Sequence, residues 1–280
     1  KFLEHNYPDL IGNVSTCKSP QQMFGALAKT YFADQTEIHP SKIVSVSVMP
    51  CTAKKYEAQR PEMCSSGYRD VDYVLTTREL AKMIRQAGID FSQLPDLPAD
   101  ELMGAYSGAG TIFGASGGVM EAALRTAYKL LTGTELEHID ITAVRGMDGI
   151  KEASVDINGL QVSVAVAHGL GNARKLLDEI REGKSPYHFI EIMACPGGCV
   201  GGGGQPIGFD MAMRDLRGET LYKEDKSLPV RRSHENPSII KIYDLYLEKP
   251  LGEKSHHLLH THYTRRDNTL FEIQTTDTHA

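Results

Sequence analysis

The sequence predicts an α/β protein with two lobes and one site between them. Short runs rich in β-branched residues alternate along the chain with longer stretches of helical periodicity. Two of these runs, over 43–49 and 187–193, end in the same pattern. In each, a final Met is followed by one residue and then by Cys. Ligands of open α/β sheets bind where the carboxyl ends of strands converge. We therefore expect Cys51 and Cys195 to face one site from the two lobes.

The other elements follow from periodicity, caps and turns. We expect helices over 1–10, 52–62, 77–87, 117–131, 172–181 and 238–247, and further strands over 72–76, 153–157 and 160–167. Asn158-Gly159, between the last two strands, is a strong hairpin signal. The segment 91–100 contains two prolines and is expected as a surface loop. Four apolar residues of the 117–131 helix share one face, which we expect to pack on the core: Val119, Ala123, Ala127 and Leu130.

Composition narrows the possible classes of protein. The chain has 280 residues, of which 41% are hydrophobic, so it can form one large domain or two lobes that share a core. Its 30 Lys and Arg against 36 Asp and Glu leave a net charge of −6, which argues against a nucleic-acid partner. No stretch approaches the ~20 consecutive apolar residues of a transmembrane helix. The first residue, Lys1, opens a helix without a cap, so we expect the native polypeptide to begin further upstream.

The five cysteines are Cys17, Cys51, Cys64, Cys195 and Cys199. An odd number of dispersed cysteines without a secretory signal argues against disulfides and favours the cytoplasm, with a periplasmic location left open. Cys64 fits a small buried apolar side chain. Cys195 and Cys199 instead stand in a glycine-rich run, where soft thiolates and approaching backbone amides suit an iron–sulfur cluster. Zinc is the alternative, but structural zinc sites favour two closely spaced pairs.

Lys54 follows Cys51 by three residues. Its ammonium could donate a hydrogen bond to an anionic ligand of a metal centre. Glu57, at i+3, is placed to pair with Lys54 and hold its direction. The alternative is a solvated helix lysine.

Together these motifs resemble those of the iron–iron hydrogenases. Residues 49–57 (MPCTAKKYE) are similar to the second signature of that family, and residues 193–206 (MACPGGCVGGGGQP) to the third. Residues 113–125 (FGASGGVMEAALR) and 15–21 (STCKSPQ) also match the family. The resemblance extends over nearly the whole chain, and HTHY at 260–263 is similar to the family's tail.

The resemblance implies a two-lobed fold of the iron-hydrogenase large-subunit kind. Small mixed or parallel sheets would be flanked by helices, with the cluster in the cleft between the lobes. Residues 1–280 would form the H-cluster catalytic domain, incomplete at its N-terminus. Residues 207–280 would be a C-terminal segment that wraps on the same domain.

The resemblance also implies the H-cluster, a 4Fe–4S cubane joined through one cysteine sulfur to a two-iron unit with CO, cyanide and a bridging dithiolate. The metal ligands would be Cys51, Cys195 and Cys199, with Cys199 bridging the two units, and Lys54 would bond one cyanide. The other residues implied to line the cofactor are Met49, Pro50, Met193, Gln21, Phe113 and Ser116. For the two methionines, ordinary core packing is a compatible alternative.

One family feature is missing from the sequence. The first signature, Thr-Ser-Cys-Cys-Pro, is expected just before Lys1, where it supplies the fourth cubane ligand and a proton-transferring cysteine. Cys17 matches a different family position and does not replace it. Of the family's proton path only Ser15 carries over, and a cap or turn serine is the alternative. We favour a longer chain or subunit whose upstream portion supplies the ligand over a degenerate relative, because Lys54 and Glu57 are present.

The implied function is reversible conversion of H2 into two protons and two electrons. The partners would be ferredoxin or an electron-transfer subunit or domain, because the chain has no four-cysteine ferredoxin segment, together with cluster maturation proteins. A sensory or iron–sulfur-assembly relative is the alternative, although we expect such relatives to lose second-signature residues. A Rossmann oxidoreductase is disfavoured, because Gly108-Ala109-Gly110 does not continue as Gly-x-Gly-x-x-Gly. We expect His260 and His262 to be packing or surface residues rather than zinc ligands.

Overall fold

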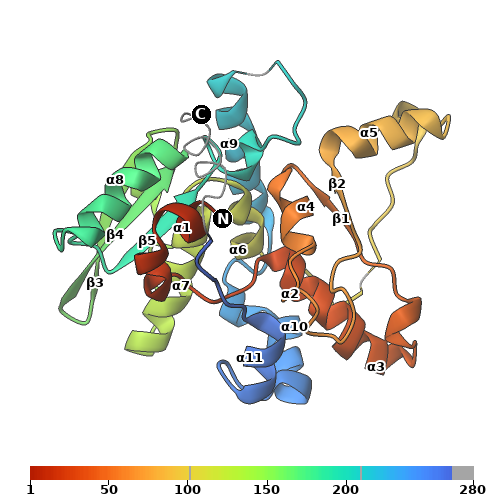
Figure 1. The fold of residues 1–280 in the computed structure, drawn as a ribbon, viewed down its shortest axis with the longest axis horizontal. Coiled ribbons are helices and arrows are strands. Elements are labelled where there is room, and N and C mark those ends of the chain that lie inside the picture. Colours follow the sequence, from red (N-terminus) through yellow and green to blue (C-terminus); the bar gives the residue numbers. More distant parts are fainter. Residues whose placement is uncertain (101, 209, 267–280) are drawn as a thin grey trace, which may run out of the picture.

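Two small sheets lie on opposite sides of the molecule, with helices around and between them (Figure 1). The computed structural model describes residues 1–100, 102–208 and 210–266. The first sheet has two parallel strands, and the second has three strands of mixed direction. The predicted two-lobed α/β fold is therefore confirmed. The strands are β1 (Val46–Met49), β2 (Tyr73–Thr76), β3 (Ile150–Ile157), β4 (Leu160–His168) and β5 (Phe189–Met193).

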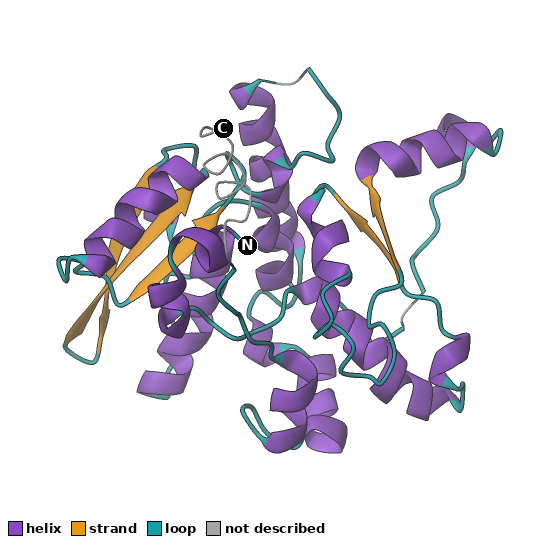
Figure 2. Cartoon of the chain, viewed as in Figure 1, coloured by secondary structure: helices purple, strands orange, loops and turns teal. Residues whose placement is uncertain are grey.

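Helices frame both sheets (Figure 2). They are α1 (Phe2–Asn6), α2 (Pro20–Leu27), α3 (Ala33–Thr36), α4 (Ala53–Ala58), α5 (Thr77–Gln86), α6 (Gly108–Thr111), α7 (Gly118–Thr132), α8 (Leu170–Arg181), α9 (Met211–Ser227), α10 (Pro237–Ile242) and α11 (Glu253–Leu259). Short 3-10 or π turns are η1 (Pro8–Asn13), η2 (Ala28–Phe32), η3 (Pro40–Lys42), η4 (Phe91–Gln93), η5 (Ile112–Gly114), η6 (Thr142–Val144), η7 (Cys199–Gly201), η8 (Ser233–Glu235) and η9 (Tyr243–Leu247). Among the described residues, none of these helices is both long and apolar enough to cross a bilayer.

The larger sheet is built from a hairpin and a parallel crossover. Asn158 and Gly159 both have positive φ, as a two-residue hairpin turn requires, so β3 and β4 pair antiparallel as predicted. The chain then returns through α8 to place β5 parallel to β4, with His168 opposite Met193. Helix α7 packs on the face that carries Val164 and Val166, whereas α8 covers the opposite face.

The smaller sheet delivers the second cysteine motif. Strand β1 ends at Met49, opposite Thr76 at the end of β2. Thr76 and Glu79 form a reciprocal capping box that starts α5 at the end of β2. Met49 packs against the small core of this lobe, which includes Val71 and Val74. Both Met-x-Cys motifs therefore begin at the carboxyl end of a strand, as the sequence predicts.

The C-terminal helices contact both lobes. Asp225 on α9 is buried and pairs with Arg125 on α7. Near the end of the described chain, the Lys18 N–H donates to the Leu259 carbonyl, and the Thr261 N–H donates to the Thr16 carbonyl. The predicted wrapping segment, 207–280, includes residues 209 and 267–280, which lie outside the described part of the chain.

Several predicted helices are shorter than expected. The 1–10 helix ends at Asn6 and continues as a 3-10 turn, because Pro8 lacks an N–H and disfavours helical geometry at Tyr7. The 52–62 helix is restricted to α4, and the 238–247 helix divides into α10 and a π turn. Helices α2, α3, α6, α9 and α11 were not among the predicted elements.

The predicted buried face of α7 is wrong. Leu130 is 75% exposed, and Val119, Ala123 and Ala127 are only half-buried. The buried positions include Met120, Leu124 and the charged pair Glu121 and Arg125. The reason is that α7 packs against α9 as well as against the sheet. The charged pair Glu121 and Arg125 is therefore buried at positions that periodicity assigns to the surface.

Candidate metal centre

The two cysteine motifs meet through their backbones. The Gly204 N–H donates to the Pro50 carbonyl oxygen at 2.9 Å. A Cβ at Gly202 would lie 1.9 Å from that same oxygen, so no larger residue fits there without a backbone shift. On the other side of the loop, Arg78 donates to the Gly203 carbonyl at 2.9 Å. The glycine run therefore allows the loop after Cys199 to press against the loop that holds Cys51.

Three thiols, from Cys51, Cys195 and Cys199, gather at this junction. Burial raises the pKa of the Cys195 thiol, and the nearby Cys51 raises it further. Burial also raises the pKa of Cys199, which lies within electrostatic range of both other thiols and of Lys54. Partly buried thiols that repel one another's charged forms need a positive centre if they are to be held as thiolates. The arrangement therefore suits a cationic metal group.

The spacing of the three thiols does not suit a single zinc ion. Zinc–sulfur bonds of about 2.3 Å place the ligand sulfurs of a tetrahedral site about 3.8 Å apart. Within 1–100, 102–208 and 210–266, only one trio of His, Cys, Asp or Glu has ligand atoms within 4.8 Å of one another, and it contains no cysteine. The sulfurs of Cys51, Cys195 and Cys199 are therefore not all within 4.8 Å of one another.

Lys54 is held in place by Glu57, as predicted. Its Nζ lies 2.8 Å from Glu57 Oε2, and both side chains are about three-quarters buried. The same carboxylate oxygen accepts hydrogen bonds from Ser19 and from the buried Gln21. Gln21 also donates to the Lys54 carbonyl and accepts from Ser47 on β1. Helix α2 thereby fixes the direction of the lysine.

A third loop closes the junction from the larger lobe. The Ser116 N–H donates to the Gly197 carbonyl at 3.0 Å. A Cβ at Gly198 would lie 2.6 Å from the Ser116 nitrogen, and Gly198 has a φ of +91°, which favours glycine. Phe113 precedes this contact by three residues and packs in a small apolar cluster with Ala109 and Ile112.

His168 was not singled out by the sequence, yet it holds the loop between Cys195 and Cys199. Its Nδ1 accepts the Gly197 N–H at 2.5 Å, while the Met147 backbone bonds to the ring as well. Burial lowers the pKa of His168, which keeps the ring neutral and leaves Nδ1 free to accept. Its place at the end of β4, beside Met193, is the signal that could have identified it.

The predicted lining residues border three different cavities. Cys51, Lys54 and Cys17 line one of about 260 Å³. Met49 and Gln21 line an apolar one of about 590 Å³ along β1. Ser116 lines one of about 350 Å³ on the far side of the third motif, toward α9. Cys195 and Cys199 line none of these three cavities.

Ser15 lies on the surface close to the first of these cavities. Its Oγ accepts the Cys17 N–H, which is the geometry of a serine turn, and its carbonyl accepts the Tyr263 hydroxyl. Its role in proton transfer stays a prediction. His260 bonds to Thr16 and stacks on His256.

The expectation that Cys64 is buried is wrong. Its side chain is exposed and bonds to the Pro61 carbonyl. The reason is that Cys64 lies in an irregular turn after α4, where Met63 supplies the buried side chain instead.

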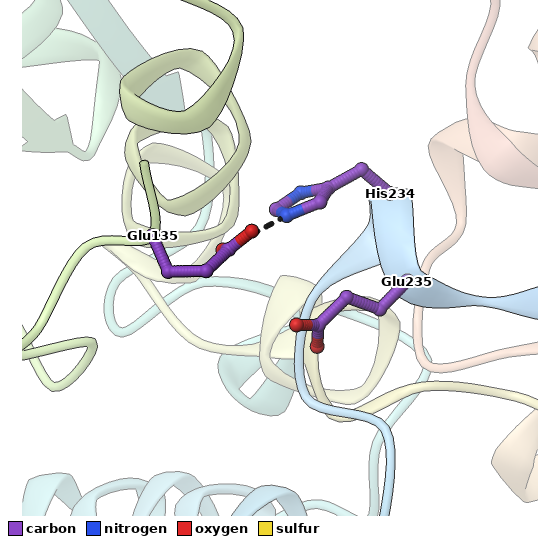
Figure 3. A group of neighbouring side chains, drawn as sticks. All are labelled: Glu135, His234 and Glu235. Carbon is purple, nitrogen blue, oxygen red and sulfur yellow. Dashed lines mark hydrogen bonds and ion pairs between the residues drawn. The ribbon is translucent and has the colours of Figure 1, made fainter. Parts of the chain in front are cut away.

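The trio of possible metal ligands is Glu135, His234 and Glu235 (Figure 3). The Glu135 carboxylate already bonds to Lys129, Arg232 and His234, and Lys129 lowers its pKa. Two of the three ligands are exposed. We interpret the trio as a surface ion-pair network that joins α7 to η8.

The residues at the cysteine junction fit the cluster that the sequence implies. Three soft thiols converge, a lysine ammonium lies near one of them, and glycines allow backbone amides to approach the sulfurs. A cubane takes four thiolates, and these residues provide three.

Known proteins share this architecture. The fold matches a variant of the apo [FeFe]-hydrogenase HydA1 from Chlamydomonas reinhardtii with a TM-score of 0.81 and 46% identity, covering 94% of this chain and 73% of that chain. The NADP-reducing hydrogenase subunit HndD of Solidesulfovibrio fructosivorans is 56% identical over 267 residues, which are 95% of this chain and 46% of the relative.

Two other relatives differ in location or role. The periplasmic [Fe] hydrogenase large subunit of Nitratidesulfovibrio vulgaris is 58% identical over 207 residues, covering 74% of this chain and 49% of the relative. Cytosolic iron–sulfur assembly component 3 of Rattus norvegicus is 36% identical over 258 residues, covering 89% of this chain and 53% of the relative. The chain spans about half the length of these curated relatives.

A two-lobed α/β fold with thiols from both lobes at one junction defines a protein of the iron-hydrogenase class. The chain belongs to the family of the iron-only hydrogenase large subunit, C-terminal domain, whose family model matches residues 1–203. The model of the iron hydrogenase small subunit matches residues 211–266.

Proposed function

We propose that the protein catalyses the reversible oxidation of H2 to protons and electrons at an H-cluster. The observation that carries this proposal is the position of the Lys54 ammonium, held by Glu57 within electrostatic range of the Cys199 thiol, in a junction that also holds Cys51 and Cys195. A simple iron–sulfur protein does not need a directed cation beside its bridging cysteine, whereas a centre with anionic cyanide ligands does.

The proposed ligands are Cys51, Cys195 and Cys199, with Cys199 shared between the cubane and the two-iron unit. When bound, the H-cluster supplies the iron site at which H2 is formed or cleaved. Lys54 would donate a hydrogen bond to an anionic ligand of the group and so would orient the two-iron unit. The residues proposed to line the group and exclude water are Met49, Pro50, Met193, Gln21, Phe113 and Ser116, with Ser15 on the route for protons.

The C-terminal part would belong to the same domain. The small-subunit match over 211–266 and the pairing of Asp225 with Arg125 support a segment that wraps on the catalytic fold, from 207 onward. We propose that electrons arrive from a ferredoxin or an electron-transfer subunit, and that upstream polypeptide supplies the fourth cubane cysteine. Maturation proteins would insert the two-iron unit, and a cytoplasmic location agrees with the free cysteines.

Infrared spectroscopy of the full-length protein, matured anaerobically, tests this proposal. We expect bands of metal-bound CO and cyanide together with H2 turnover. Cys199→Ala should remove both, because the two-iron unit loses its bridge. Cys64→Ala is the matched control, since this exposed cysteine bonds only to a nearby carbonyl among the described residues. H2 turnover by Cys199→Ala would contradict the assignment.

An iron–sulfur-assembly or sensory role is the second candidate, and it is supported by the 36% identity to the rat assembly component. This candidate predicts a cubane absorption and paramagnetic signal in the full-length protein without CO or cyanide bands. Bands together with turnover would exclude an assembly role as the main function.

A further inference from the structure

A lysine and a glutamate are buried on the same face of the larger sheet, on the two strands that flank β4. Lys151 lies on β3 opposite Val166 of β4, and Val166 lies opposite Glu191 of β5, so the two charges occupy one row of the sheet. Lys151 is 5% exposed and Glu191 is 6% exposed. Neighbouring strands are about 4.8 Å apart, which separates the two side chains by about two strand spacings. They form no direct ion pair within 4.0 Å, and the segment at the start of α7 lies between them.

The two side chains form hydrogen bonds with opposite ends of one peptide group. Lys151 Nζ donates to the Ser116 carbonyl at 3.1 Å, and the Gly117 N–H donates to Glu191 Oε1 at 2.7 Å. The Ser116 carbonyl and the Gly117 N–H belong to the same peptide bond. Its dipole therefore points its negative end at an ammonium and its positive end at a carboxylate.

Burial lowers the pKa of Lys151 and raises the pKa of Glu191, whereas the hydrogen bonds to both groups favour their charged forms. Lys151 Nζ also donates to Ser116 Oγ and to the Gly146 carbonyl, so its three acceptors match the three donors of an ammonium. The second oxygen of Glu191 accepts the Met120 N–H at 2.7 Å. Since both carboxylate oxygens accept from amides at a helix N-terminus, the ionised form fits the site.

The preceding peptide group, Ala115–Ser116, contacts the cysteine loop. The Ser116 N–H donates to the Gly197 carbonyl, and Gly117 has a φ of +95° with the Val144 carbonyl 1.9 Å from the place of a Cβ. Glu191 lies within electrostatic range of Cys199. The clamp therefore acts on the position of the loop, and the charge of Glu191 acts on the local field at the candidate bridging cysteine.

We propose that Lys151 and Glu191 are positioning residues, which clamp the Ser116–Gly117 peptide group between two buried charges. The clamp holds the segment 113–116 against the Cys195–Cys199 loop and tunes the reduction potential of the metal centre there. The tuning rests on the proposed function, whereas the clamp itself does not. A negative charge near the centre disfavours reduction, and a positive charge favours it.

Hydrogen exchange tests the clamp without any cofactor. In full-length Glu191→Gln, one of the two amide bonds loses its acceptor, so we expect at least tenfold faster exchange in the peptide that covers 113–124. Lys151→Met should have the same effect. Lys29→Met is the matched control, because this buried lysine pairs with Asp72 in the other lobe. It should lower the unfolding temperature and leave exchange over 113–124 unchanged. Unchanged exchange in both clamp variants would overturn the proposal.

The reduction potential of the bound iron–sulfur centre distinguishes tuning from simple destabilisation. We expect Glu191→Gln to shift the potential to more positive values, Lys151→Met to more negative values, and the double variant to return toward wild type. Lys29→Met should leave it unchanged. Shifts of the same sign in both single variants would refute the tuning. If no iron–sulfur centre binds to the wild-type protein, the proposed function fails, and hydrogen exchange still decides the clamp. If Lys151→Met does not fold, Glu191→Gln alone tests the clamp by hydrogen exchange and the tuning by the sign of its shift in potential.

Discussion

Gly204 donates its backbone N–H to the carbonyl oxygen of Pro50 at 2.9 Å, and this bond joins the two loops that carry the candidate ligands. The loops come from different lobes and are about 150 residues apart in the sequence. Because the contact is between backbones, it depends on residues that have no side chain to intervene. The geometry of the thiol junction therefore depends on glycines as much as on cysteines.

Gly202→Ala should separate the two loops. Its Cβ would lie 1.9 Å from the Pro50 carbonyl oxygen, and a backbone oxygen can move away only if the loop moves. We expect a loss of about 1–3 kcal/mol in unfolding free energy and less iron bound per chain. Gly203→Ala is the matched control, since its nearest neighbour is the Thr52 side chain at 3.5 Å. Denaturant titration and iron analysis measure both effects, and equal losses in the two variants would argue against the contact.

Lys54→Met should impair the two-iron unit and spare the fold. The variant keeps the aliphatic stem but loses the ammonium that Glu57 directs. We expect weaker infrared bands of CO and cyanide per cubane and an unfolding temperature close to wild type. Lys55→Met serves as control, because Lys55 points instead toward Val74 and Glu79. Bands of full intensity in Lys54→Met would show that the lysine does not hold the unit.

His168→Leu should loosen the loop between the two third-motif cysteines. The variant leaves the buried Gly197 N–H without its acceptor, which costs about 1–3 kcal/mol. His168→Asn places an amide oxygen near the position of Nδ1 and should recover much of the stability. Thermal unfolding and iron retention after gel filtration measure both variants. A histidine effect that Asn does not relieve would assign the role to the ring rather than to its acceptor.

Arg125→Met should be strongly destabilising. Arg125 is fully buried and bonds to Glu121, Asp225 and two backbone carbonyls, so its removal leaves two buried carboxylates with fewer partners. We expect a loss of about 3–5 kcal/mol in unfolding free energy. Arg181→Met, which breaks the exposed pair with Asp9, should change stability far less. Urea denaturation provides the comparison.

Asp140→Asn should change how the free energy of unfolding depends on pH in the acidic range. Burial raises the pKa of Asp140, but hydrogen bonds from Arg231 and Arg145 outweigh burial and lower its pKa to about 2. The unfolded carboxyl, with a pKa of 3.8, takes up its proton first as the pH falls. The stabilisation is therefore complete above pH 3.8 and is lost toward pH 2. We expect the difference between wild type and variant to shrink over that range, whereas a constant difference would contradict the assignment.

The local elements were largely predictable because their signals are local. Asn158-Gly159 specifies its own turn, and the capping residues at Thr76 begin α5 one position after the strand. The run of β-branched residues that ends at Met49 needs no partner to be recognised as a strand. The resemblance of the cysteine motifs to a known family placed three thiols at one site before any contact was visible.

The sequence by itself therefore determined the α/β class, the strand ends and the chemistry of the cysteine motifs, since these depend on neighbouring residues. Only the tertiary structure decided that Arg125 is buried rather than exposed, that His168 holds the third-motif loop, and that Lys151 and Glu191 share one peptide group. Each of these depends on segments brought together from far along the chain. A buried charge is stable only where distant partners meet it, and periodicity carries no information about such partners.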